Sequence, residues 1–303
     1  MTVSENKKVS LSIIVTAWNG SSHLRECLSS LENQIEDASG AEVITVSNFE
    51  GGISEIKAEF PFVKYFILSQ ETTVPQLRTY GVLRAGGAVI AVTEDFCTPD
   101  SAWCREIEKA HKLPHAAIGG AVKNKHDAGA LDWAVFFYDY GKYLPPLRAG
   151  VTETLSGLNV SYKKEILEQL RENYEDGFFE TFIHEELKVR GHDLYLMPSA
   201  IVRHNKSYQL KKTVFQFFHQ ARSFAARRVN NLPPSRRLLF ITASVILPIL
   251  LPARVVWRTM NKGRHLKELL RSLPFLMILT SVWAFGEFCG YLNGEGKSGG
   301  EWK

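Results

Sequence analysis

A run of apolar residues that ends abruptly in two adjacent carboxylates constrains this chain most. Residues 89–92 are Val-Ile-Ala-Val, and Thr93, Glu94 and Asp95 follow at once. An unbroken apolar run of this length is typical of a central strand in a parallel sheet. Open α/β sheets bind ligands at the carboxyl ends of such strands. Because hard divalent cations prefer oxygen ligands, the acids predict a cation site that also grips substrate phosphates.

Helix capping is the alternative interpretation, since residues 98–101 (Thr-Pro-Asp-Ser) are predicted to open a helix. Capping would account for Asp100 or Ser101. It does not account for acids that precede Thr98 by three to four residues, so their position favours a functional role.

The surrounding sequence alternates apolar strands with helices. The strands are predicted over residues 11–17, 42–46 and 63–68, and helices after residue 20 and over 74–85. Leu24, Cys27, Leu28 and Leu31 lie on one face of the first helix at helical spacing. This β-α-β alternation predicts a parallel sheet with right-handed crossovers.

Four segments, in this order, resemble the family 2 glycosyltransferases of the GT-A fold. They are Ser-Ile-Ile-Val-Thr-Ala-Trp-Asn (12–19), Leu-Arg-Thr-Tyr-Gly (77–81) with Ala-Gly-Gly (85–87), Thr-Glu-Asp (93–95) and Gly-Leu-Asn-Val-Ser (157–161). They resemble the family's first strand and nucleotide loop, its arginine-glycine helix, its aspartate-rich metal motif and its acceptor-side strand. The resemblance covers roughly residues 10–205.

The resemblance implies an α/β fold, with a Rossmann-like mixed sheet flanked by helices, and an inverting sugar transfer. It also implies a UDP- or GDP-linked donor and a divalent cation, Mn²⁺ or Mg²⁺. The implied donor-binding residues are Ala17, Trp18, Asn19, Ser47, Asn48, Arg78 and Glu94, and the acceptor-side residues are Gly157 and Asn159. Arg78 would pair with the diphosphate through its planar fork, although a buried structural arginine is the alternative.

The sequence departs from the family pattern where an aspartate usually reads the nucleotide base. Val46-Ser47-Asn48 stands there instead, so base recognition is expected from Ser47, Asn48 or Glu50.

The metal motif departs too, because its first acid is Thr93. Asp95 is therefore predicted to bind the metal, with Glu94 contacting the sugar or ribose; simple packing of Glu94 at the strand end is the alternative. His204, at the end of a predicted closing strand, is the second candidate metal ligand. A structural hydrogen-bonding role is its alternative.

Glu180 lies in the segment Gly-Phe-Phe-Glu-Thr (177–181) and is predicted to be the catalytic base, because the family has its base at this distance from that glycine. A base must lie within ~2.6–3.2 Å of the proton that it takes. Phe178, Phe179 and Phe182 are expected to raise the pKa of Glu180 by desolvation. The alternative is an acid that complements the helix macrodipole. The rival acids are Glu175, Asp176, Glu185 and Glu186.

Charge is strongly segregated along the chain. Between Asp193 and Glu287, 15 Lys and Arg residues stand against the single acid Glu268, a net charge of +14, while the rest of the chain carries −10. Such asymmetry predicts an anionic partner, either nucleic acid or a membrane. Two apolar stretches, 238–253 and 273–292, favour the membrane and argue against nucleic acid.

Only the second stretch has the ~20 residues that span the ~30 Å hydrocarbon core. If both stretches crossed, the basic linker 254–271 would lie opposite the catalytic domain, against the positive-inside rule. A re-entrant or interfacial pair on anionic headgroups is therefore favoured over a two-helix hairpin. Glu287 would cost ~3 kcal/mol at mid-bilayer unless it is paired or near the surface. Core helices of a soluble oligomer are the alternative.

Other features place the chain inside the cell. The four cysteines lack zinc-ligand spacing, which indicates a reducing compartment. Residues 1–8 are polar, so no signal peptide is predicted there.

The predicted organisation is a catalytic domain (1–207), a linking amphipathic helix (208–232) and a membrane-associated helical region (233–303). The predicted function is sugar transfer to a saccharide or polyprenol-lipid acceptor at the cytosolic face of the cell membrane, as in the synthesis of cell-envelope polysaccharide. The alternative is a non-catalytic, nucleotide-sugar-binding scaffold subunit whose site has decayed at Ser47 and Thr93. A homo-oligomer is left open.

Overall fold

The computed structural model describes residues 9–37, 40–230 and 232–301, so the prediction for residues 1–8 lies outside the described residues. The chain divides into two compact units. A sheet unit comprises residues 1–125 and 143–205, and a helical unit comprises residues 126–142 and 206–303. Residues 126–142 lie within the first domain of the predicted linear division but pack with the helices at the end of the chain.

A nine-stranded mixed sheet forms the centre of the sheet unit. Its strands are β1 (Leu11–Ala17), β2 (Ala41–Ser47), β3 (Val63–Ile67), β4 (Val89–Glu94), β5 (Cys97–Pro99), β6 (Ala117–Asn124), β7 (Gly150–Thr152), β8 (Val160–Lys163) and β9 (Leu194–His204). The strand order is β3-β2-β1-β4-β8-β6-β9-β5, with β7 paired to β9. The α/β class and the three predicted strands before β4 are confirmed, to within a residue or two at their ends.

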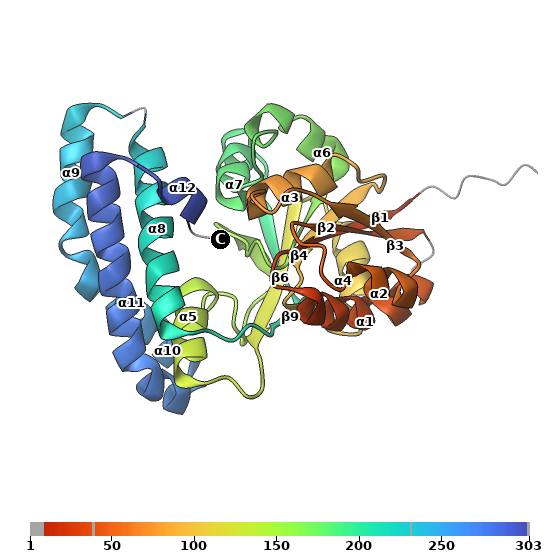
Figure 1. The fold of residues 1–303 in the computed structure, drawn as a ribbon, viewed down its shortest axis with the longest axis horizontal. Helices are drawn as coiled ribbons and strands as arrows, with labels where there is room; N and C mark the ends of the chain where they lie inside the picture. The colour runs from red at the N-terminus through yellow and green to blue at the C-terminus, as the bar shows by residue number, and fades with distance from the viewer. Residues whose placement is uncertain (1–8, 38–39, 231, 302–303) are drawn as a thin grey trace, which may run out of the picture. The chain divides into compact units, whose positions relative to one another are not determined.

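Helices cover both faces of this sheet. They are α1 (Ser21–Asp37), α2 (Ile53–Glu59), α3 (Val74–Val82), α4 (Trp103–Ala110), α6 (Lys164–Glu168) and α7 (Glu180–Val189). Figure 1 shows α3, α6 and α7 on one face and α1, α2 and α4 on the other. Ile14 and Val92 point into a core with Leu77 and Ile183 on the α3 side. Since successive strand residues face opposite sides, two covered faces explain the unbroken apolar runs.

The helix predicted to open at residues 98–101 begins later. Thr98 and Pro99 belong to β5, where Thr98 pairs with Arg203 of β9. Helix α4 starts at Trp103, whose N–H donates to the carbonyl of Asp100 at 2.9 Å. Pairing with a strand a hundred residues away thus overrides the local capping signal.

The strand order reverses direction at β1. This strand pairs in parallel with β2 on one side and with β4 on the other. The chain therefore leaves β1 towards β2 and later returns to β4 on the opposite side, which makes a topological switch point. Ligand-binding crevices of open α/β sheets lie at such points, and here the residues after β1 and after β4 meet.

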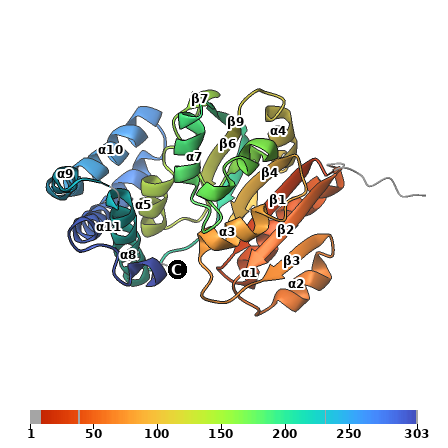
Figure 2. The ribbon, with the colours of Figure 1, turned by 90° about the horizontal axis from the view of Figure 1, so that it is seen from above.

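The helical unit contains α5 (Ala130–Asp139), α8 (Leu210–Val229), α9 (Pro234–Ser244), α10 (Leu247–Lys262), α11 (Leu266–Asn293) and α12 (Ser298–Glu301). Helix α11 packs along α8 and also contacts α5, α9 and α10 (Figure 2). Gly286 and Gly290 allow the close approach to α8, because a Cβ on Gly286 would lie 2.5 Å from the carbonyl oxygen of Phe218, and one on Gly290 would strike that of Arg222.

The apolar stretch 238–253 is not one segment. It is divided between α9 and α10, which meet at an angle of 66°. The predicted basic linker 254–271 is also largely helical, since it forms the end of α10 and the start of α11. Arg258 and Lys262 donate to the carbonyls of Phe137 and Lys142, so these cations stabilise the carboxyl end of α5 and the turn after it.

Two histidines, the half-buried His111 and the buried His184, brace β8 in the sheet unit. His111 Nε2 lies 2.8 Å from Ser161 Oγ, and His184 Nε2 lies 2.9 Å from the hydroxyl of Tyr162. Burial lowers the pKa of His111 to about 3 and that of His184 to about 4. Both rings therefore stay neutral in the folded protein well below the ordinary histidine pKa of 6.5.

The lowered pKa values of His111 and His184 predict that the protein loses stability in mild acid. The unfolded chain protonates its histidines as the pH falls, while folded His111 and His184 do not, so the free energy of unfolding should fall from about pH 6.5 towards pH 4. In His111→Gln, the slope of that free energy against pH should drop by up to about 1.4 kcal/mol per pH unit. Urea unfolding at several pH values measures it. His126→Gln, at an exposed histidine, is the control and should keep the parent slope.

Candidate active site

Asp95 joins the ends of β1 and β4. Its Oδ2 accepts the backbone N–H groups of Trp18 at 2.9 Å and Asn19 at 2.7 Å, and its Oδ1 accepts Asn19 Nδ2 at 2.8 Å. Burial raises the pKa of Asp95 to about 6; the hydrogen bonds from Asn19 and Trp18 oppose that rise, and the neighbouring Glu94 charge adds to it. The carboxylate thereby fixes the loop that was predicted to bind the nucleotide.

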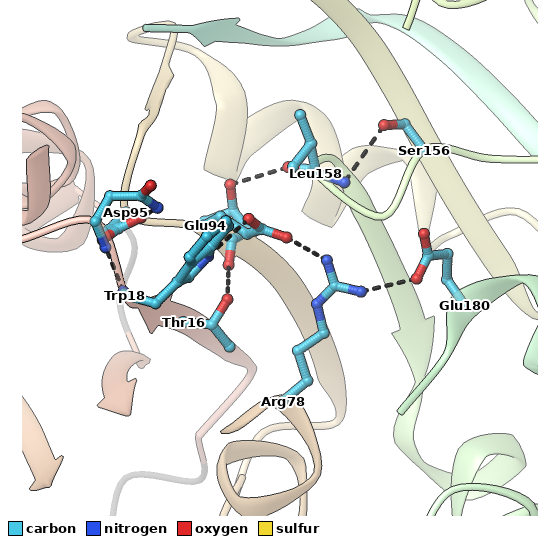
Figure 3. Close-up of polar contacts among 10 residues, drawn as sticks. Thr16, Trp18, Arg78, Glu94, Asp95, Ser156, Leu158 and Glu180 are labelled. Carbon is cyan, nitrogen blue, oxygen red and sulfur yellow. Dashed lines mark hydrogen bonds and ion pairs between the residues drawn. The ribbon is translucent and has the colours of Figure 1, made fainter. Parts of the chain in front are cut away.

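A second chain of contacts runs from Glu94 to Glu180 through Arg78, a buried residue of α3. Arg78 Nη2 donates to Glu94 Oε1, and Arg78 Nη1 donates to Glu180 Oε2 at 2.7 Å. Glu94 Oε2 also accepts Trp18 Nε1 at 3.1 Å. Figure 3 shows the guanidinium lying between the two carboxylates. Arg78, predicted to bind the donor, therefore contacts Glu180, the predicted base, directly.

Glu180 is the more open end of this chain. Its side chain is 29% exposed, whereas those of Arg78 and Glu94 are 8% and 7% exposed. The other oxygen of Glu180 lies over Gly157, where a Cβ would come within 2.5 Å of Oε1. Gly157, predicted on the acceptor side, thus leaves the space that the Glu180 carboxylate occupies.

The prediction that aromatic residues raise the pKa of Glu180 is wrong. Burial does raise it, but the Arg78 guanidinium and a hydrogen bond from the backbone N–H of Glu180 itself outweigh burial, so the pKa lies below its ordinary value. Phe178 also points into the core, where it packs on Tyr162 and Tyr174 rather than on a carboxylate. The aromatic run in the sequence does not form the predicted collar.

Two other predicted positions make structural hydrogen bonds. Asn159 is buried and donates to the carbonyls of Ala121 and Ala200, while its oxygen accepts Trp103 Nε1 at 2.8 Å. These bonds hold the core strands together, and the acceptor-side role of Asn159 stays a prediction. Thr93 donates to the carbonyl of Leu158 at 2.9 Å and ties β4 to the Gly157 loop.

The base-reading positions lie at the end of β2. Ser47 Oγ is bonded to both the N–H and the carbonyl of Phe49, so this hydroxyl shapes the turn. Asn48 donates its N–H to the carbonyl of Ala17 at 3.2 Å and its side-chain amide to the carbonyl of Thr72 at 3.1 Å. Recognition of the base by Ser47, Asn48 or Glu50 stays a prediction.

The residues fit a cation that is held largely by its substrate. Among the described residues, no group of three or more His, Cys, Asp or Glu side chains could enclose a metal. Oδ1 of Asp95 carries one hydrogen bond and keeps a lone pair for a cation. One carboxylate with phosphate oxygens and water suffices for Mg²⁺. His204 is fully buried and packs on the ring of Phe96 at 5.0 Å.

Sequence reasoning missed the Arg78–Glu180 pair and the bond from Trp18 Nε1 to Glu94. The two ionic partners are separated by 102 positions, and no local pattern links them. The rival acids do not share this position. Glu186 pairs with Arg190 at 2.7 Å, and Glu175, Asp176 and Glu185 are exposed.

A comparison with known protein families shows which family the chain belongs to. The profile of "Glycosyl transferase family 2" matches residues 12–171. The chain belongs to glycosyl transferase family 2. The match begins in β1 and contains Asp95, Arg78 and Gly157, and it ends nine residues before Glu180. No curated protein sequence matches the chain.

Solved structures share the fold at low sequence identity. The mannosyltransferase PcManGT from Pyrobaculum calidifontis, in complex with GDP-Man and Mn²⁺, is 12% identical, with a TM-score of 0.58 over 95% of this chain and 88% of its own. TarS 1–349 from S. aureus is 12% identical, with a TM-score of 0.51 over 90% of each chain. GalNAc-T7 with UDP, GalNAc and Mn²⁺ is 17% identical, with a TM-score of 0.52 over 76% of this chain and 52% of its own. The GT-A fold is confirmed.

Proposed function

We propose that this family 2 member is an inverting transferase that moves a sugar from a UDP- or GDP-linked donor to a saccharide or lipid-linked acceptor. The observation that carries the proposal is the position of Glu180. It is the accessible carboxylate of the Glu94–Arg78–Glu180 chain, 2.7 Å from an arginine that also contacts the end of β4. Glu94 and Asp95 are both buried and held, so Glu180 is the group that an acceptor can reach.

The donor would lie at the switch point. Its diphosphate would approach the Trp18–Asn19 loop and Arg78, whose planar fork suits phosphate oxygens. Asn48 would contact the base. Two of the solved neighbours carry GDP-Man or UDP, which supports a nucleoside diphosphate donor.

Charge balance supports a divalent cation. Glu94, Asp95 and Glu180 bring three negative charges when ionised, and Arg78 returns one positive charge. A diphosphate would meet net repulsion there, whereas Mn²⁺ or Mg²⁺ would offset it. When bound, the cation would stabilise the charge of the leaving diphosphate. Asp95 is the residue proposed to hold it, with His204 as the second proposed ligand.

Asp95→Asn removes the negative charge of the side chain while keeping nearly the same shape. The amide oxygen can still accept the loop N–H groups, so the fold should persist, while Mn²⁺-dependent UDP or GDP affinity should fall by ~10-fold or more, the scale of a lost charge-assisted contact. Isothermal titration with and without Mn²⁺ measures it. Asp100→Asn removes a charge five residues away and is the control. Parent-like Mn²⁺-dependent affinity in Asp95→Asn would rule out the metal role.

The proposed transfer needs one proton acceptor. The acceptor hydroxyl oxygen attacks the anomeric carbon, its proton passes to Glu180, and the bond from that carbon to the diphosphate oxygen breaks. A single accessible carboxylate suits one displacement with inversion, because a covalent intermediate would need a second exposed carboxylate as nucleophile.

Glu180→Gln should therefore abolish turnover but not binding. We expect the transfer rate to fall by ~10² or more, the usual scale for a positioned base, with donor binding retained. Glu172→Gln, an exposed acid of the same unit, is the control and should match the parent. Transfer at nearly the parental rate in Glu180→Gln would contradict the assignment. A parent protein that binds donor but never hydrolyses or transfers it would favour the non-catalytic scaffold.

The helical unit supports a membrane location. Its described surface carries most of the large exposed apolar side chains of the chain, in the range 238–292. On α11, Leu270, Met277, Phe285 and Leu292 form an exposed stripe that is ~33 Å long at 1.5 Å per residue. Helix α11 is long and apolar enough to cross a bilayer. Helices α9 and α10 are long and apolar enough only when taken together as one bent segment.

We retain the re-entrant or interfacial arrangement at the cytosolic face. The 66° bend between α9 and α10 suits a segment that enters and returns. Arg254, Arg258, Lys262 and Arg264 precede α11, and the positive-inside rule places such residues on the cytosolic side. Anionic headgroups would attract each of them by ~1 kcal/mol.

Single cysteines at Arg264 and Lys297, both exposed, would test the topology in a Cys289→Ser background. In sealed vesicles with the sheet unit outside, both should react with an impermeant thiol reagent if the pair is re-entrant or interfacial. A protected Arg264 position would indicate a two-helix hairpin. A full-length protein that stays monodisperse without detergent or lipid would contradict the membrane location.

A further inference from the structure

Arg78 holds the candidate base in a state that is poorly suited to catalysis. Its Nη1 lies 2.7 Å from Glu180 Oε2, and its Nη2 contacts Glu94. A carboxylate that is ion-paired in this way has one oxygen occupied. An effective general base needs a free oxygen and a pKa near the working pH. The contact that locates Glu180 therefore also weakens it as a base.

The two ends of the bridge differ in how firmly they are held. Glu94 is 7% exposed and accepts a second hydrogen bond, from Trp18 Nε1 at 3.1 Å. Glu180 is 29% exposed, and its other oxygen lies against Gly157, which offers no side-chain donor. The Glu180 end is consequently the one that an incoming anion can displace.

We propose that Arg78 is a positioning residue that exchanges Glu180 for the donor diphosphate, so that donor binding frees the base for the acceptor hydroxyl. This inference rests on the proposed function and deepens it. A diphosphate offers two oxygens to the guanidinium fork, which one Glu180 oxygen cannot match. Released Glu180 keeps its place at the N-terminus of α7, next to Gly157.

If Arg78 exchanges partners, the Glu180 carboxylate and the donor diphosphate compete for its guanidinium. Each anion must then weaken the binding of the other to Arg78. If donor binding removes Arg78 from Glu180, the Glu180 charge must weaken donor binding by the same factor. Donor should also bind before acceptor, since the base becomes available only afterwards. A purely structural Arg78–Glu180 pair would produce neither effect.

A double-mutant cycle on nucleotide affinity tests the exchange. Isothermal titration of UDP and GDP with Mn²⁺ would compare the parent, Glu180→Gln, Arg78→Met and the double variant. We expect Glu180→Gln to tighten binding about 10-fold in the parent background and to change it less than about 2-fold in the Arg78→Met background. Glu172→Gln controls for the general loss of one negative charge and should change affinity less than about 2-fold.

Unchanged or weaker affinity in Glu180→Gln would overturn the exchange, as would equal tightening in both backgrounds. If Arg78→Met does not fold, the parent's pH profiles replace it. The acid limb of kcat, which reports the donor-bound enzyme, should then lie at higher pH than that of kcat/KM for the donor. Coincident limbs would overturn the exchange.

These readouts separate the exchange from the proposed function. Loss of transfer in Glu180→Gln without tighter nucleotide binding would leave the base in place and remove the exchange. Tighter binding with transfer retained would support the exchange and move the base to another residue.

Discussion

The guanidinium of Arg78 is the interaction on which the site depends. It lies between Glu94, at the end of β4, and Glu180, at the start of α7, and Asp95 stands beside Glu94. Without it, buried neighbouring carboxylates would face one another uncompensated. Breaking a buried ion pair by removing one partner typically costs 3–5 kcal/mol in other proteins, which is about a third of the stability of an ordinary domain. The arginine therefore supports the local fold as well as the proposed chemistry.

The parts of the fold that depend on local signals could be predicted from the sequence. Strand β1 is an apolar run bounded by a turn, and α3 begins at Thr73 with a capping box and a proline, so both follow from nearby residues. Strand β5 could not be predicted, because it forms only through pairing with β9. Hydropathy alone does not mark the break between α9 and α10, but Pro248 and Pro252 predict that the stretch is interrupted, and Pro248 lies in the first turn of α10.

In the candidate site, too, the positions of residues could be predicted from the sequence, whereas the directions of their side chains could not. The motifs place Asp95, Arg78 and Gly157 at one end of the sheet, since Asp95 follows β4, Gly157 precedes β8, which is antiparallel to β4, and Arg78 lies midway along α3. The directions of side chains were not predictable from spacing. Asn159 points into the core and Phe178 packs on Tyr162, while the pKa of Glu180 follows from an arginine 102 positions away.

The helical unit buries an acid and exposes part of its apolar surface. Glu287 is buried, and its oxygens accept Trp283 Nε1 and the hydroxyl of Tyr291, both at 2.8 Å, with Arg228 at 3.6 Å. Pairing offsets much of the cost that an acid incurs in an apolar helix. Several large apolar side chains of α10 and α11 face outwards, among them Trp257, Leu270 and Phe285, whereas Leu276 and Leu279 are buried within the unit.

The proposed membrane location would cover that outer surface, and charge favours it over a second copy of the chain. The segment between Asp193 and Glu287 carries +14, so two copies placed face to face would repel one another. A bilayer with anionic headgroups offers both an apolar phase for the exposed stripe and counter-charge for the lysines and arginines around it. The same excess of positive charge that the sequence displays thus argues for lipid over a second copy as the partner of these helices.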